Sequence, residues 1–234
     1  MDKLENVNSA YDEFYYTELT PAVVRFNTIC FGDFQELSLE DKAKAVNLQL
    51  DIINQEMVEE YRRWYAVDMV EELDAIADTL FTIAYLHYQC EVIETKLSKE
   101  DQAIINDMVN IDKMELLFLD FEAFLKTFLT HFDLDIVINA TRLVIKNNEQ
   151  KYTDSLEYFN TWESPSDENL SRKSLTFGDK EYYLFVNENG KVRKKVGFEG
   201  VDLNSLVSLQ LDRFQDQLFD DKDFSDDLIG DAIS

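Results

Sequence analysis

Glycine and proline are scarce in this chain, and their scarcity limits the folds that it can adopt. Six glycines and two prolines are spread through 234 residues. All-β sandwiches and glycine-rich phosphate loops usually need more turn residues than this. Hydrophobic residues make up 45% and aromatic residues 13%, so a sizeable core can form. We therefore predict a mainly α-helical protein, an antiparallel bundle with room for one large domain or for one domain and an appendage.

Two long helices are predicted in the first half of the chain. Ser38, with Asp41 three residues later, is close to a capping box and opens a helical pattern over residues 39–65. A second pattern covers residues 68–92. Because the join YAVD is short, the two helices should pack antiparallel. Further helices are predicted in SKEDQAIINDMVN, DKMELLFLDFEAFLKTFLTHF and DLDIVINATRLVIKNNEQK.

The character of the sequence changes after residue 160. We expect a helical domain over residues 1–160, followed over residues 161–234 by a loop, a β-hairpin and an acidic C-terminal segment. The run TWESPSDENLSRKS is predicted to be the loop. YYLFVNENGKVRKKV is predicted to form the hairpin, with a type I′ turn at Asn189 and Gly190. The Asp-rich end is interpreted either as a frayed tail or as a short partner-binding helix.

The predicted hairpin also carries the densest basic cluster of the chain, formed by Lys191, Arg193, Lys194 and Lys195. One interpretation is that these cations protect an edge strand from aggregation. The other is that they lean over an acidic site and attract an anionic substrate.

The net charge of −26, from 48 acids and 22 bases, restricts the partners of the protein. Most of its surface should repel nucleic acids, whereas a divalent cation or a basic protein should be attracted. The N-terminus lacks the pattern of a signal peptide, and no run of 18 apolar residues is present. We therefore expect no membrane contact and a cytoplasmic location, in the host cytoplasm if the protein is viral.

Acidic residues recur at helical spacing on both long helices. Glu56 and Glu59 lie about 60° apart on the first helical wheel, and Glu71, Asp74 and Asp78 share a narrow stripe on the second. Two carboxylates about 4 Å apart repel by roughly 4 kcal/mol at an effective dielectric constant near 20. If the two stripes face each other, the negative charge of their carboxylates must be neutralised, for which a divalent cation is suited. Ligands that are all oxygen atoms select Mg²⁺, Mn²⁺ or Ca²⁺ over zinc.

A solvated acidic surface is the alternative interpretation of these stripes. In that case Arg62 and Arg63 would neutralise some of the acids. Glu60 and Glu72 lie off the stripes, so both are predicted to be peripheral.

The two acidic motifs resemble those of a known enzyme family. Helical nucleoside triphosphate pyrophosphohydrolases of the MazG and dimeric dUTPase superfamily carry EExxE on one helix and ExxD on the next. Here the motifs read QEMVE, with Gln55 in place of an acid, and EELD. EELDAIADTLF, VIKNNEQKYTD and NENGKVRKKVGFEGVDL are similar, in order, to segments of the phosphoribosyl-ATP pyrophosphohydrolase-like branch, which is common in bacteriophages.

The resemblance implies an activity, a cofactor and an assembly. A (d)NTP would be cleaved to (d)NMP and pyrophosphate with Mg²⁺, or with Mn²⁺ as the alternative ion, by a homodimer or tetramer. The implied metal ligands are Glu56, Glu59, Glu71 and Asp74. Asp78 completes the catalytic set, and the implied substrate-binding residues are Asn148, Lys151 and Lys146.

A second class of function is compatible with the composition. A non-catalytic acidic interaction protein, such as a DNA mimic or an inhibitor of a basic host protein, would also carry a large negative charge. Release of pyrophosphate from a nucleotide in the presence of Mg²⁺ separates the two classes.

Overall fold

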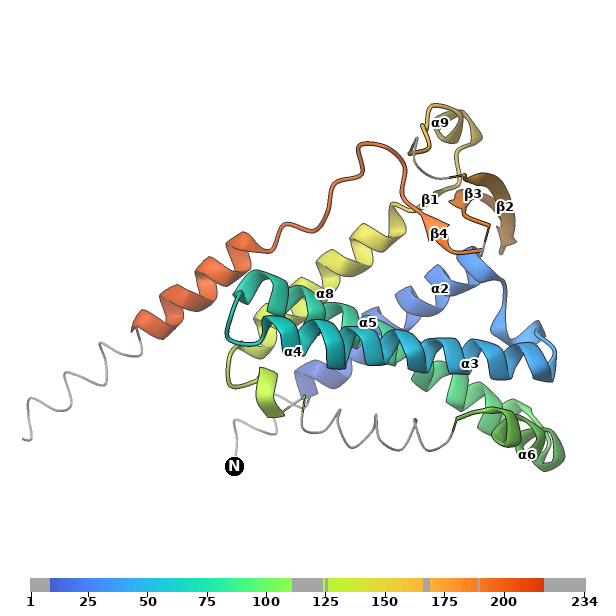
Figure 1. The fold of residues 1–234 in the computed structure, drawn as a ribbon, viewed down its shortest axis with the longest axis horizontal. Helices are drawn as coiled ribbons and strands as arrows, with labels where there is room; N and C mark the ends of the chain where they lie inside the picture. Colours follow the sequence, from blue (N-terminus) through green and yellow to red (C-terminus); the bar gives the residue numbers. More distant parts are fainter. Residues whose placement is uncertain (1–8, 111–123, 125, 166–168, 189, 217–234) are drawn as a thin grey trace, which may run out of the picture.

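The computed structural model describes residues 9–110, 124, 126–165, 169–188 and 190–216, and it is mainly α-helical, as predicted (Figure 1). Its helical elements are η1 (Tyr15–Leu19), α2 (Thr20–Phe31), η2 (Phe34–Glu36), α3 (Leu39–Ile53), η3 (Asn54–Glu60), α4 (Tyr61–Trp64), α5 (Met69–Lys96), α6 (Lys99–Met108), α8 (Leu134–Glu149) and α9 (Leu156–Asn160). Helical turns also cover residues 9–14 and 204–216. In the described part of the chain, no helix has the length and apolar character needed to cross a membrane.

The two long predicted helices form an antiparallel pair. The first runs through α3, η3 and α4 without a break, and α5 returns alongside it (Figure 1). Ser38 caps α3, since its Oγ accepts a hydrogen bond from the Asp41 N–H at 3.1 Å. Asp68 caps α5 by accepting from the N–H groups of the next turn. The connection bends at Ala66, whose φ of +56° is unusual for a residue with a Cβ.

The helical core is organised around α5. This helix packs against α2, α3 and α8, and it is buried on most of its circumference, as expected of a central helix. Its inward positions follow helical spacing through Leu73, Ile76, Leu80 and Ala84. The packing of α5 therefore determines how deeply each of its acidic residues is buried and towards which neighbouring helix it points.

A small antiparallel sheet caps one end of the bundle (Figure 1). Its strands are β1 (Tyr152–Thr153), β2 (Ser171–Phe177), β3 (Lys180–Val186) and β4 (Val192–Arg193). β2 pairs with one edge of β3 along its full length. The two short strands β1 and β4 both pair with β3 as well, so they share its other edge.

The structure corrects the predicted loop that precedes the hairpin. Residues 171–174 were included in that loop, but they form the first half of β2. Most side chains of β2 are exposed on both faces, so the strand lacks the alternation that identifies a half-buried strand in a sequence. Only its pairing with β3 reveals it.

The predicted reversal between β3 and β4 is present, but its loop is longer than a two-residue turn. The Asn187 N–H donates to the Lys191 carbonyl at 3.0 Å, and the Gly190 N–H donates to the Asn187 carbonyl at 2.9 Å. Gly190 has a φ of +76°, which glycine adopts without strain. Asn189, the other residue of the predicted type I′ turn, lies outside the described residues.

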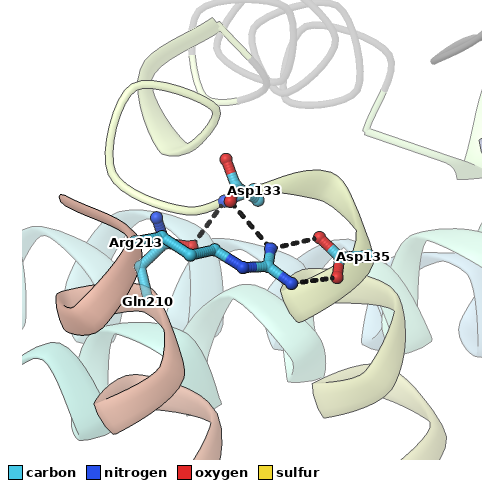
Figure 2. A network of polar contacts seen from close by, with 4 residues as sticks. All are labelled: Asp133, Asp135, Gln210 and Arg213. Atoms are coloured by element: carbon cyan, nitrogen blue, oxygen red, sulfur yellow. Dashed lines mark hydrogen bonds and ion pairs between the residues drawn. The ribbon is translucent and has the colours of Figure 1, made fainter. Parts of the chain in front are cut away.

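Residues 204–216 form a helix that docks at the start of α8 and that includes the first residues, 211–216, of the Asp-rich end. Figure 2 shows Arg213 between the carboxylates of Asp133 and Asp135, with hydrogen bonds of 2.8 Å to both. Gln210 Oε1 accepts from the Asp133 N–H, also at 2.8 Å. The remaining acidic residues, 217–234, and residues 112–123 and 125 of the helix predicted over residues 112–132 lie outside the described part.

Candidate active site

The first acidic motif lies on a π-helical turn. Residues Asn54–Glu60 form η3, in which the Tyr61 N–H donates to the carbonyl of Glu56, five residues earlier. This wider turn changes the predicted wheel, because residues three apart no longer share a face, whereas residues four apart still do. Glu60 therefore comes beside Glu56, whereas Glu59 is exposed. Glu60, which was predicted to be peripheral, lies within electrostatic reach of Glu56 and also pairs with Arg63 at 3.2 Å.

The second acidic motif lies on the first turns of α5, against which η3 packs. Asp74 and Asp78 are half-buried and share one face of the helix, while Glu71 is exposed one turn earlier. The packing of η3 on α5 brings Glu56 into electrostatic reach of Asp74 and Asp78. Of the predicted acids, these three are gathered together, with Glu71 beside Asp74.

The three gathered carboxyl groups resist ionisation. Burial is the main cause that raises the pKa of Glu56, and the charges of Glu60 and Asp74 raise it further. Burial and the charge of Glu71 raise the pKa of Asp74. The pKa of Asp78 is raised to about 7, first by burial and then by Asp74 and Glu56. Such mutual repulsion is typical of carboxylates that share a site.

Lys151 approaches the same carboxyl groups from the end of α8. Its half-buried Nζ donates to Asn148 Oδ1 at 2.5 Å and lies 5.6 Å from the centre of the Phe26 ring. Burial lowers the pKa of Lys151, while the charge of Asp78 opposes that shift. Asn148 is buried and orients the ammonium group, whereas the predicted Lys146 lies exposed on α8.

Two residues of the basic cluster also reach the acidic site. The charge of Lys191 partly opposes the rise in the pKa of Glu56, and the charge of Lys194 partly opposes the rise for Asp74 and Asp78. Lys195 points elsewhere, since its Nζ donates to the Tyr158 hydroxyl at 2.6 Å and lies over the Tyr158 and Trp162 rings. Within the basic cluster, Lys191 and Lys194 therefore lie near the acidic site, whereas Lys195 lies on the rings of Tyr158 and Trp162.

Glu72 lies off the acidic stripe, as predicted, and its buried side chain has a structural role instead. Its side chain is fully buried, with Oε1 2.9 Å from Nδ1 of His131 and Oε2 accepting from the Ala66 N–H at 3.2 Å. It supports the bend before α5 rather than facing Asp74. No local signal identified this role, because His131 lies 59 residues further along the chain.

The donor chemistry of the site fits a hard divalent cation, since it offers half-buried carboxylates that repel one another. As the side chains are placed, no group of three or more His, Cys, Asp or Glu residues within the described ranges is close enough to hold a metal ion. To share one ion, the side chains of Glu56, Asp74 and Asp78 would have to turn towards one another.

In comparisons with protein-family models, curated proteins and solved structures, no match to this chain was found. The residues of the site therefore carry the functional proposal by themselves.

Proposed function

We propose that this protein is a Mg²⁺-dependent nucleoside triphosphate pyrophosphohydrolase, which cleaves between the α and β phosphates to give a nucleoside monophosphate and pyrophosphate. The observation that carries the proposal is the gathering of Glu56, Asp74 and Asp78 from two packed helical elements, with lysines within electrostatic reach. Phosphoryl transfer requires neutralisation of charge and positioning of groups more than a covalent nucleophile.

The ion would be held by Glu56, Glu59, Glu71 and Asp74. When bound, Mg²⁺ neutralises phosphate charge and lowers the pKa of a coordinated water. Glu56 and Asp74 supply half-buried oxygens, and the exposed Glu59 and Glu71 each lie three residues from one of them in sequence. Burial and then neighbouring acids raise the pKa of Glu56 and of Asp74, and a bound cation would stabilise the ionised form of both groups.

Asp78 is proposed as the general base. Asp78 lies within electrostatic reach of Glu56 and Asp74, and a carboxylate beside the bound ion is suited to accept a proton from the attacking water. The oxygen of the attacking water bonds to the α phosphorus, its proton passes to Asp78, and the bond to the bridging oxygen breaks to release pyrophosphate. Lys151, oriented by Asn148, pairs with the phosphate charge.

The test is direct incubation of the purified protein with Mg²⁺ and a panel of dNTPs and NTPs, with assays for pyrophosphate and nucleoside monophosphate. We expect equal amounts of both products, and no reaction with EDTA. Glu56→Gln should abolish turnover. Glu94→Gln, which removes an exposed acid from the far part of α5, is the matched control. If no nucleotide releases pyrophosphate, the proposal fails and a non-catalytic acidic protein is favoured.

A further inference from the structure

The pairing of the sheet brings together two segments that lie far apart in sequence. On β3, Leu184 pairs with Tyr152 of β1, and the next residue, Phe185, pairs with Arg193 of β4. Because β2 occupies the opposite edge, Tyr152 and Arg193 are neighbours along a single edge of β3.

This arrangement places two lysines at one junction. Both short strands run antiparallel to β3, so they run in the same direction as each other. Lys194 directly follows the last residue of β4, and Lys151 directly precedes the first residue of β1. The end of β4 and the start of β1 pair with consecutive residues of β3, so the two lysines lie at the same junction. A hydrogen bond of 2.9 Å from Asn147 Nδ2 to the Glu199 carbonyl holds the segment after β4 against the end of α8. Backbone pairing therefore brings these two cations together.

Both side chains are supported by their surroundings. Lys194 Nζ lies 4.4 Å from the centre of the Phe198 ring, and Lys151 is held by Asn148 and Phe26. The ammonium groups repel each other, and Lys194 lowers the pKa of Lys151. Two cations that the backbone holds together are stabilised by an anion that pairs with both, and a diphosphate carries its charge on two adjacent groups.

We propose that Lys151 and Lys194 form a clamp for the diphosphate part of the substrate, the β and γ phosphates that leave as pyrophosphate. Both lysines lie within electrostatic reach of Asp78, so the bond to be broken would lie between the clamp and the carboxylates. This inference rests on the proposed function for its substrate, but the clamp itself is tested without any reaction.

The experiment measures binding of inorganic pyrophosphate to the full chain by isothermal titration calorimetry in the presence of Mg²⁺. Lys194→Gln should weaken binding by about tenfold or more, as expected for the loss of one charge-assisted hydrogen bond. It should also reduce the dependence of Kd on salt concentration. Lys195→Gln removes the same charge one residue away, where the ammonium lies on Tyr158 and Trp162, and should leave Kd within about twofold. Circular dichroism checks that both variants fold.

The outcomes distinguish the clamp from the activity. The clamp is overturned if pyrophosphate does not bind to the wild-type protein, if Lys194→Gln leaves Kd unchanged, or if Lys195→Gln weakens binding equally. A protein that releases pyrophosphate from nucleotides but binds it independently of Lys194 would retain the proposed function and lose the clamp. Binding that depends on Lys194, without nucleotide cleavage, would retain the clamp and reject the function.

Discussion

Nδ1 of His131 lies 2.9 Å from Oε1 of Glu72, a carboxylate with no exposed surface. The pair connects the first turn of α5 to the turn before α8, and the Tyr65 ring stacks on the His131 ring at a centroid distance of 4.6 Å. Glu72 is therefore an architectural residue, although it adjoins Glu71, a proposed metal ligand.

Removal of the histidine should destabilise the fold. His131→Ala leaves Oε1 of the buried Glu72 carboxyl group without its side-chain hydrogen-bond partner, which costs roughly 2 kcal/mol of unfolding free energy. Urea unfolding followed by circular dichroism at pH 7 measures the change. The His131→Ala, Glu72→Gln double variant should recover part of the loss, because no charge then remains buried. A loss below about 0.5 kcal/mol in the single variant would contradict the role of the pair.

Glu71 should behave in the opposite way to Glu72. Glu71→Gln should reduce turnover by orders of magnitude, because the site loses a proposed metal ligand. Without metal, its melting temperature should stay the same or rise, because Glu71 raises the pKa of Asp74 by repulsion. Steady-state kinetics and thermal melts with EDTA test both effects. Full Mg²⁺-dependent activity in this variant would rule out the assignment.

Asp78 should make the metal-free protein less stable as the pH rises. Its pKa is about 7 in the folded protein, against an ordinary value of 3.8. Between these values the native state keeps a proton that the unfolded chain has released, so stability falls as the pH increases through this window. Asp78→Asn removes the effect, and it should raise the unfolding free energy at pH 8 by roughly 2 kcal/mol and leave it unchanged near pH 3. Denaturant unfolding with EDTA at both pH values is the measurement, and equal stabilities at pH 8 would refute it.

Arg213 should control the docking of the helix over residues 204–216. Its guanidinium makes two hydrogen bonds to Asp135 and one to Asp133, all at 2.8 Å (Figure 2). Arg213→Ala should increase hydrogen exchange in this helix and leave α5 protected, and Arg213→Lys should not restore protection because lysine lacks the planar fork. The neighbouring Asp212→Ala serves as the control. Unchanged exchange in Arg213→Ala would show that the buried Leu203 and Val207 suffice.

The protein is expected to assemble into a homodimer or tetramer. Large apolar side chains remain exposed on α3 and α6, which pack against each other, among them Leu48, Ile104 and Met108. Their burial between subunits would remove apolar surface from water. Light scattering at micromolar concentration should give at least twice the chain mass of 27.4 kDa. A clean monomer would count against this prediction, and Leu48→Glu should shift the equilibrium towards monomer.

The sequence by itself determined the features that depend on near neighbours. Scarce glycine and proline, the capping serines and the 3.6-residue periodicity predicted the mainly helical fold and the antiparallel pair of long helices. The reversal near Gly190 was also predicted, because its signal lies within a few residues. Such signals act through local backbone preferences, so they can be recognised in a single sequence without knowledge of the tertiary structure.

Only the tertiary structure decided how the acidic residues are divided. The π-helical turn of η3 moves Glu59 off the face that carries Glu56 and leaves it exposed, while the contact with His131 holds Glu72 in the interior. The meeting of Lys151 and Lys194 likewise depends on the shared edge of β3. Burial and charge coupling arise from segments that are distant in sequence, and no local pattern contains that information.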